Sequence, residues 1–253
     1  MIRQKRESPM PCHSTTALVT GGARRLGAAC VRALAREGMT VAIHHHGSEA
    51  AARELAAAII AQGGTAHTLQ ADLADSGQTE TLIQRAEAAF GKPVTLLVNN
   101  AAIFERGSVR HTTVGQWNRH LAINLTAPFL LTRDFAQRLP PGQTGQIIQI
   151  IDRHAHQPRA DYAAYSAAKS ALWTLTRQAA LELAPAIRVN AIGPGPILPA
   201  PGDSPERFKT IGAATPAGRV GSPDDIVAAL LFLIRHDFIT GELIRVDGGE
   251  HLR

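Results

Sequence analysis

The sequence has little cysteine, little lysine and no long apolar run, and each shortage argues against a class of protein. The two cysteines, Cys12 and Cys30, have neither metal-site spacing nor the pattern of a disulfide framework, which favours a reducing cytoplasm. No apolar run reaches the roughly 18 residues of a membrane-spanning helix. Residues 1–14 carry positive charge without the apolar core of a leader peptide, so we expect a flexible tail and no contact with a membrane.

Lysine is rare although the chain is basic. Of 26 basic residues, only Lys5, Lys92, Lys169 and Lys209 are lysines. The basic residues are scattered, and no basic stripe alternates with aromatic side chains. The net charge of +5 therefore indicates a solvated surface rather than nucleic-acid binding. Because lysine is so rare, a lysine that falls within a sequence motif is a candidate functional residue.

Short β-rich runs alternate with longer alanine- and leucine-rich runs at helical spacing. This pattern predicts an α/β protein with a doubly wound parallel sheet, a Rossmann fold in a single domain over residues 15–253. Strands are predicted at residues 17–19, 40–43, 66–70, 95–98, 146–151, 187–191 and 243–246. Helices are predicted at residues 25–37, 48–62, 76–90, 115–138, 161–184 and 223–235.

Two later segments carry strong local signals. The proline- and glycine-rich segment 193–205 predicts a loop over the carboxyl edge of the sheet, either a mobile lid or an ordinary surface loop. Ser222 followed by Pro223 and two acidic residues predicts the start of the last helix, because serine caps and proline suits the first helical position.

The sequence TGGARRLG, residues 20–27, follows the first predicted strand and opens a helix. A tight turn there supplies backbone N–H groups and a positive dipole end for a pyrophosphate. Arg25 stands where a second glycine is expected, which places a cation in the phosphate loop.

The second strand ends in three histidines, Gly47 and Ser48, without an acidic residue. Dinucleotide folds that prefer NAD usually carry an acid there for the ribose 2′-OH. Its absence, with Arg24 or Arg25 nearby, favours the 2′-phosphate of NADP. A metal site is the weaker alternative, because adjacent strand residues point to opposite faces. Asp72 and Leu73 are expected near the adenine, and Asp72 also suits a helix cap.

Tyr165 and Lys169 are four residues apart on a predicted helix, so they share one face. A lysine ammonium beside a phenol favours the phenolate, which predicts a lowered tyrosine pKa and an acid–base role. Tyr162 is the weaker candidate because Ser166 occupies the position four residues after it.

Six motifs in order, from about Ala17 to the C-terminus, resemble the short-chain dehydrogenase/reductase family. They are TGGARRLG, the NNAA of residues 99–102, Asn124 in INLTAPF, Tyr165-x-x-x-Lys169, Pro194-Gly195 and the VDGG of residues 246–249. The resemblance places the family's catalytic tetrad on Asn124, residue 152, Tyr165 and Lys169. It also implies homotetramers formed through the two long helices and the last strand.

Position 152 holds Asp152, thirteen residues before the tyrosine, where most relatives carry serine. With Arg25, the histidine-and-serine end of strand two and the terminal HLR, this departure resembles the pteridine reductase branch, including bacterial enzymes that reduce dihydromonapterin or dihydrofolate. Phe104 matches the aromatic residue that stacks on the pterin in that branch. The resemblance thus implies that Arg25, Phe104, Asp152 and Tyr165 bind a small-molecule pterin or folate.

The motifs also imply a set of contacts to NADPH/NADP. The expected contacts are Gly21, Arg24, Arg25, Leu26, Gly27, His44, His46, Ser48, Asp72, Leu73, Asn99, Ala101, Lys169, Pro194, Gly195 and Ile197. Two details depart from the branch: Ala102 replaces a serine, and Gly47 replaces a basic residue for which Arg24 could compensate. His154 and His156 either edge the pocket or are ordinary loop residues.

The expected reaction is pterin reduction, in which an Asp152–Tyr165 pair relays a proton to the ring. Lys169 would hold the nicotinamide ribose, and Asn124 would support the relay. The closest alternative is a carbonyl reductase or alcohol dehydrogenase of the same fold that uses Tyr165 on a C=O group. A further alternative is an NADP-binding regulator without turnover.

Overall fold

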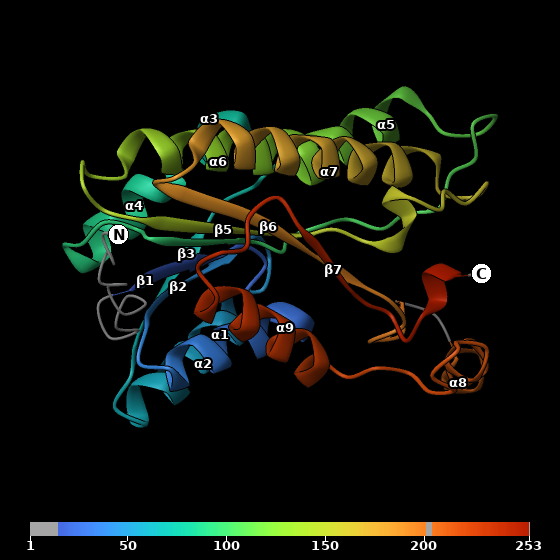
Figure 1. Ribbon diagram of the computed structural model, residues 1–253, viewed down its shortest axis with the longest axis horizontal. Helices are drawn as coiled ribbons and strands as arrows, with labels where there is room; N and C mark the ends of the chain where they lie inside the picture. Colours follow the sequence, from blue (N-terminus) through green and yellow to red (C-terminus); the bar gives the residue numbers. More distant parts are fainter. Residues whose placement is uncertain (1–14, 201–203, 253) are drawn as a thin grey trace, which may run out of the picture.

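The computed structural model describes residues 15–200 and 204–252, so the predicted tail at residues 1–14 lies outside the described residues. A seven-stranded sheet with the order β3-β2-β1-β4-β5-β6-β7 forms the centre (Figure 1), and every pairing in it is parallel. The strands are β1 (Thr16–Val19), β2 (Thr40–His45), β3 (Thr65–Gln70), β4 (Leu96–Asn99), β5 (Gly145–Ile150), β6 (Ile187–Pro194) and β7 (Leu243–Val246). This arrangement confirms the predicted doubly wound parallel sheet.

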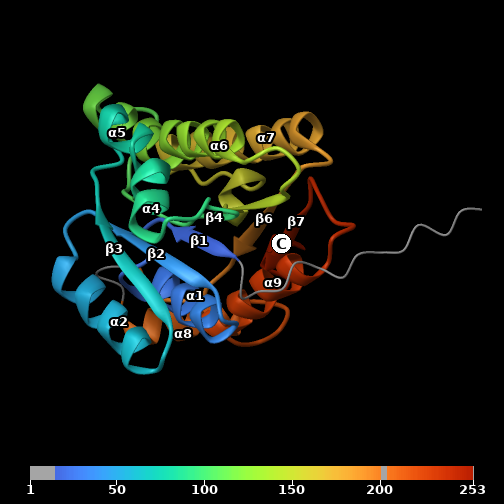
Figure 2. The same cartoon turned by 90° about the vertical axis from the view of Figure 1, so that its left-hand side faces the viewer.

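Helices cover both faces of the sheet (Figures 1 and 2). One layer contains α1 (Arg25–Arg36), α2 (Glu49–Ala61) and α9 (Pro223–Arg235). The other contains α3 (Ser76–Glu80), α4 (Leu82–Phe90), α5 (Val114–Leu121), α6 (Ala127–Arg138) and α7 (Ala163–Leu183), and α8 (Pro205–Ala213) lies near the C-terminus. No helix in the described part of the chain is long and apolar enough to cross a membrane.

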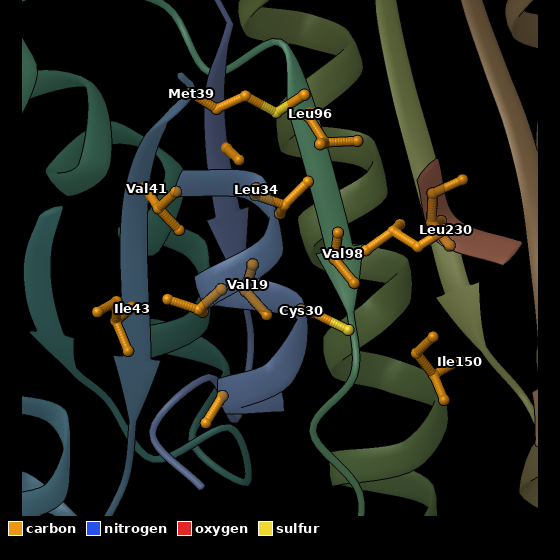
Figure 3. Packing of buried hydrophobic residues seen from close by; sticks show 14 of the residues in the cluster. Val19, Cys30, Leu34, Met39, Val41, Ile43, Leu96, Val98, Ile150 and Leu230 are labelled. Atoms are coloured by element: carbon orange, nitrogen blue, oxygen red, sulfur yellow. The ribbon is translucent and has the colours of Figure 1, made fainter. Parts of the chain in front are cut away.

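Each face of the sheet has its own apolar core. Val19, Val41 and Ile43 pack toward Leu34 and Cys30 of α1, as Figure 3 shows. Leu18, between two residues that face this cluster, points into the opposite one beneath α4 and α6. Burying a side chain of this size contributes roughly 1.5–3 kcal/mol relative to leaving it exposed. The sheet is therefore a well-packed platform for the loops at its carboxyl edge.

Two predicted helices are interrupted. The helix expected at residues 76–90 divides at Thr81. The Thr81 hydroxyl donates to the Gln78 carbonyl at 3.0 Å, so this side chain competes with backbone N–H groups for that carbonyl. The helix expected at residues 115–138 contains a π-helical turn, Ala122–Thr126, between α5 and α6. Such turns insert one extra residue and often lie at functional sites, and this one carries Asn124.

The loop predicted at residues 193–205 is shorter than expected. Strand β6 continues to Pro194, and α8 begins at Pro205, where the Ser204 side chain accepts the N–H of Arg207. Residues 201–203 lie outside the described residues. The predicted start of the last helix is confirmed, because Ser222 and Asp225 form a reciprocal capping box.

Candidate active site

Partly buried hydrogen bonds hold the glycine-rich turn after β1. The Thr20 hydroxyl oxygen accepts the N–H groups of Asn100 and Ala101 at 2.9 and 3.0 Å. The Asn100 amide donates to the carbonyls of Thr20 and Gly21 at 2.8 and 3.2 Å. The turn is thus tied to the end of β4, at the point where the strand order reverses and where ligands bind in open α/β sheets.

Two positions at this turn, residues 21 and 27, leave room only for glycine. Gly21 has φ +60°, and an added Cβ would lie 3.1 Å from the Ala101 Cα. At Gly27 a Cβ would lie 2.1 Å from the Gly21 carbonyl oxygen. Nearby, both polar atoms of the buried Asn99 side chain find no partner within the described residues. The two glycines leave the backbone at the start of α1 uncovered by side chains, and the Asn99 amide beside it lacks a partner among the described residues. This arrangement fits a phosphate-bearing dinucleotide.

His44 lies behind the turn instead of facing a ligand. Its Nδ1 accepts the Gly21 N–H at 3.1 Å, and its Nε2 lies 3.1 Å from the Ala71 carbonyl, to which it donates. Burial lowers the pKa of His44 to about 4, so the ring is neutral at ordinary pH. Because both ring nitrogens already have partners, His44 cannot also donate to a 2′-phosphate. His44 therefore supports the glycine-rich turn and does not make the expected contact with the cofactor phosphate.

The other residues expected at the adenosine end differ in how accessible they are. His46 is exposed, with its Nε2 4.0 Å from an Asp72 carboxylate oxygen, and Ser48 precedes α2 without a side-chain capping bond. Leu73 is buried in the core beneath α4. The expected capping role of Asp72 is wrong: Asp75 caps α3, because its carboxylate accepts two backbone N–H groups there.

Arg25 takes a backbone conformation that favours glycine. Its φ of +51° is the only positive value at a non-glycine position in the described chain. The left-handed region costs an L-residue roughly 1–2 kcal/mol. The guanidinium crosses the site and donates to the Pro199 carbonyl at 2.7 Å, whereas the exposed Arg24 has an extended backbone. The glycine position was thus correctly identified, and an arginine occupies it despite the backbone strain.

Asn124 fixes the segment that follows β4. Its side-chain oxygen accepts the Ile103 N–H, and its amide donates to the Ile103 carbonyl, both at 2.9 Å. The π-helical turn carries this fully buried side chain and directs it toward the segment that follows β4. Asn124 thereby sets the position of Phe104, which directly follows Ile103 in the sequence.

Tyr165 and Asp152 are brought together at the centre of the site. The tyrosine hydroxyl donates to an Asp152 oxygen at 3.0 Å. Burial, followed by the nearby negative charge of Asp152, raises the pKa of Tyr165 well above its usual value. The prediction of a lowered tyrosine pKa is therefore wrong for this structure.

Lys169 is buried and donates to the Ile150 carbonyl at 2.7 Å, with its Nζ 5.9 Å from the centre of the Tyr165 ring. Burial lowers the lysine pKa to about 8, and attraction to Asp152 opposes this shift. The negative charge of Asp152 thus acts on both Tyr165 and Lys169, and the raised pKa of Tyr165 means that the tyrosine keeps its proton.

Phe104 belongs to a stack of aromatic and cationic groups. Its ring lies parallel to that of Tyr162, with centroids 4.3 Å apart, and edge-on to Tyr165 at 4.7 Å. The guanidinium carbons of Arg106 and Arg159 lie 5.9 and 5.5 Å from the Tyr162 ring centre. Tyr162 covers one face of Phe104, which still exposes 39% of its surface. Tyr162 therefore supports the aromatic surface.

One cavity of about 430 Å³ is lined by Arg25, Phe104, Asp152 and Tyr165. Pro194 and Gly195 form part of its wall, whereas Ile197 packs into the core beneath α1 and α9. The lining also includes five charged residues that were not predicted: Arg106, Arg153, Arg159, Arg207 and Glu250. The only sequence signals for them were the position of Arg106 two residues after Phe104 and that of Glu250 directly after VDGG.

The C-terminal segment contacts the loop that follows Asp152. Glu250 pairs with Arg153 at 2.8 Å, and the Gln157 amide donates to the His251 carbonyl at 2.7 Å. The His251 ring in turn lies 2.7 Å from an Asp247 oxygen. Two contacts thus connect the C-terminal segment to residues 153–157, which follow Asp152, and the third holds His251 to the VDGG turn.

His156 contributes little to the cavity. Its ring faces Trp173 with centroids 6.0 Å apart, and it is not among the lining residues. Partial burial, followed by the nearby charge of Arg245, lowers its pKa. In the described ranges, 15–200 and 204–252, no three histidine, cysteine, aspartate or glutamate side chains gather closely enough to hold a metal ion.

Comparison with known proteins agrees with this geometry. Residues 21–251 match the family described as enoyl-(acyl carrier protein) reductase. FolM alternative dihydrofolate reductase 1 from Brucella suis, solved in complex with NADP, is 38% identical with a TM-score of 0.92, covering 96% of this chain and 97% of that one. The Brucella canis protein of the same name, also with NADP, is 37% identical with a TM-score of 0.90, covering 96% of each chain. The 3beta-hydroxysteroid dehydrogenase 1 of Eggerthella lenta is 36% identical, with 92% of both chains covered.

Proposed function

The chain belongs to the short-chain dehydrogenase/reductase family, and we propose that it is an NADPH-dependent pteridine reductase that converts a dihydropterin or dihydrofolate to its tetrahydro form. The observation that carries the proposal is the Tyr165–Asp152 hydrogen bond of 3.0 Å inside the cavity that also contains Phe104 and Arg25. A pterin is flat and rich in nitrogen, so it needs an apolar ring to stack on and polar groups at its edge.

The proposed cofactor is NADP(H). The glycine turn accommodates a pyrophosphate, and no acidic residue at the end of β2 would repel a 2′-phosphate. The exposed side chains of Arg24 and His46, with Ser48, provide donors for that phosphate. Both Brucella proteins carry NADP, which supports the same choice.

The protein's own residues supply the proton. When bound, the reduced nicotinamide supplies a hydride to the C=N carbon, and the ring nitrogen must then gain one proton. Tyr165 keeps its proton because its pKa is raised, and Asp152 accepts the hydrogen bond of the same hydroxyl. The pair can therefore deliver a proton to the substrate and replace it from solvent through the carboxylate. Lys169 holds a positive charge beside this pair.

The proposal is tested by NADPH oxidation with dihydrobiopterin, dihydromonapterin and dihydrofolate. We expect turnover of at least one of them, with NADPH strongly preferred over NADH. Turnover of none would refute the proposal.

A carbonyl reductase is the second candidate, because relatives with other substrates in their names match the chain over most of its length. They include the steroid dehydrogenase and a 3-oxoacyl-[acyl-carrier-protein] reductase of Synechocystis, 34% identical over 92% of this chain and 95% of its own. Tyr165 and Lys169 would serve a C=O substrate equally well. Reduction of ketones or aldehydes without any activity on dihydropterins would favour this candidate.

We also infer a homotetramer formed through the two long helical segments, which include α6 and α7, and through the last strand, β7. Phe129 and Leu181 are large apolar side chains on the outer surfaces of these helices, and Leu181 is 86% exposed. Covering them would bury apolar surface. Light scattering should give four times the chain mass, whereas a monomeric mass would contradict the inference.

A further inference from the structure

Two carboxylates line the active-site cavity in the described part of the chain, and the proposed reaction uses only one of them. Asp152 accepts the Tyr165 hydroxyl at 3.0 Å and belongs to the proton path. The other is Glu250, whose side chain is only 14% exposed. Acidic side chains are usually left in water unless a partner holds them. A nearly buried acid in the wall of this cavity therefore needs a role.

The turn after β7 fixes the backbone of Glu250. The buried Asp247 accepts the N–H of Gly249 at 2.9 Å through one carboxylate oxygen and the N–H of His251 at 3.0 Å through the other. Glu250 lies between these two residues, and its own N–H donates to the Asp247 carbonyl at 3.1 Å. Gln157, from a separate segment, donates to the His251 carbonyl at 2.7 Å. A residue held in this way pays little conformational entropy when it binds a ligand.

The Glu250 carboxylate has capacity for further donors. It forms an ion pair with Arg153 at 2.8 Å. A carboxylate offers two oxygens with about four lone-pair sites, so a single ion pair leaves acceptor positions for a ligand. Burial raises the pKa of Glu250, Arg153 opposes this shift, and the nearby negative charge of Asp152 adds to it. Additional N–H donors would therefore stabilise the ionised form of Glu250.

A pterin presents a matching pair of donors along one edge. Its 2-amino group and the adjacent N3–H point in the same direction, like the paired N–H groups of a guanidinium, and such a pair suits a carboxylate. Hydrogen bonds to a charged acceptor contribute more to binding than those between neutral groups. A simple ketone or aldehyde has no such donors, so a cavity acid favours a pterin over a carbonyl substrate.

We propose that the Glu250 carboxylate accepts the 2-amino and N3–H groups of the substrate's pyrimidine ring. This inference rests on the proposed function, which places that ring against Phe104 and beside Asp152. All three side chains line the same cavity of about 430 Å³. Glu250 thus selects aminopyrimidinone rings, and Arg153 holds its carboxylate through the ion pair.

The test compares two ligands that differ only at C2. The ligand 6,7-dimethylpterin carries the 2-amino group, whereas 6,7-dimethyllumazine carries a carbonyl oxygen at the same position. Calorimetry in the presence of NADP, which has no hydride to transfer, measures their binding without turnover. We expect the unaltered protein to prefer the pterin by at least about tenfold, because charge-assisted hydrogen bonds are roughly twice as strong as neutral ones. Glu250→Gln should remove most of this preference, because glutamine replaces one acceptor oxygen with an NH₂ donor.

The matched control is Glu105→Gln. It also removes one negative charge from an ion pair, the one with Arg119 at 3.3 Å, but Glu105 is not among the lining residues. This control should keep the preference for the pterin within about twofold of the unaltered protein, since it leaves the acceptor at residue 250 in place. A second variant, Glu250→Asp, keeps the negative charge beside Arg153 and serves if Glu250→Gln does not fold. Its shorter side chain should still weaken binding of the pterin more than that of the lumazine.

The outcome for Glu250 is separable from the outcome for the proposed function. If no dihydropterin is reduced but the preference for the pterin depends on Glu250, the proposed function fails and the binding role stands. If dihydropterins are reduced but Glu250→Gln keeps the full preference, or weakens both ligands equally, the binding role is overturned and the proposed function stands. Loss of the preference in Glu105→Gln, or its absence from the unaltered protein, would also overturn the binding role.

Discussion

The proposed cofactor end of the site, around residues 20–27, and the proposed substrate end, the cavity at Phe104 and Asp152, are built differently. Around the glycine turn, the buried Thr20 and His44 and the half-buried Asn100 hold backbone atoms through hydrogen bonds of 2.8–3.1 Å. The substrate cavity is instead lined by side chains from distant segments, several of them exposed arginines. The difference indicates that cofactor binding is determined by the packed fold, whereas the choice of substrate depends on side chains that can change without disturbing it.

The largest effect is expected at the centre of the substrate end. Tyr165→Phe removes the hydroxyl that donates to Asp152 at 3.0 Å and should lower kcat for a dihydropterin by about 10²–10⁴-fold, the usual range for a lost acid–base group. Steady-state kinetics measure kcat, and fluorescence titration with NADPH checks that cofactor affinity is kept. A variant that retains most of its turnover would remove Tyr165 from the proton path.

At the cofactor end, a single methyl group should disturb binding and folding together. Gly27→Ala places a Cβ 2.1 Å from the Gly21 carbonyl oxygen, so we expect NADPH affinity to fall at least tenfold and the free energy of unfolding to fall by about 1–3 kcal/mol. Gly47→Ala is the control, because nothing lies within 4 Å of its Cβ position. Equal behaviour of the two variants in denaturation and cofactor titration would show that the turn is not tightly packed.

The support given by His44 should appear as pH-dependent stability. Its pKa is lowered from 6.5 to about 4 in the folded chain, so between these values the unfolded state binds the proton and the folded state does not. Stability should therefore fall as pH drops from about 6.5 to 4, by on the order of 3 kcal/mol from this group. Denaturant titrations should lose this dependence in His44→Gln and retain it in His46→Gln, which alters an exposed ring. An unchanged profile in His44→Gln would contradict the account.

The smallest effect is expected where the two ends meet. Arg25→Gly relieves a φ of +51° and should raise the free energy of unfolding by about 1 kcal/mol, while the KM of a dihydropterin rises more than that of NADPH. Arg24→Gly, at an extended backbone position, should give no such gain in stability. Equal losses of pterin and NADPH affinity in Arg25→Gly would identify Arg25 as a phosphate ligand only.

Local patterns predicted the parts of the molecule that depend on neighbours in sequence. Alternating strands and helices gave the sheet, the serine and proline at residues 222 and 223 gave the start of α9, and the spacing of Tyr165 and Lys169 put both on one face of α7. Helix α8 was missed because its Ser204–Pro205 start lies inside a proline- and glycine-rich segment.

The features that were missed depend on contacts between distant residues. No pattern around His44 reveals that Gly21 and Ala71 occupy its two ring nitrogens. The pKa of Tyr165 was predicted in the wrong direction because burial and Asp152 outweigh the lysine four residues away. Arg106, Arg159 and Arg207 carry no recognisable motif in the sequence, and they line one cavity only because three separate segments converge there.

The most direct test of the account is the effect of Asp152→Ser on dihydropterin reduction. Serine can still accept the Tyr165 hydrogen bond but cannot carry a proton from solvent as a carboxylate can. We predict that kcat for the dihydropterin falls about 100-fold, while NADPH affinity measured by fluorescence titration stays within about twofold. Full turnover by the serine variant would contradict the claim that the Asp152–Tyr165 pair delivers the proton.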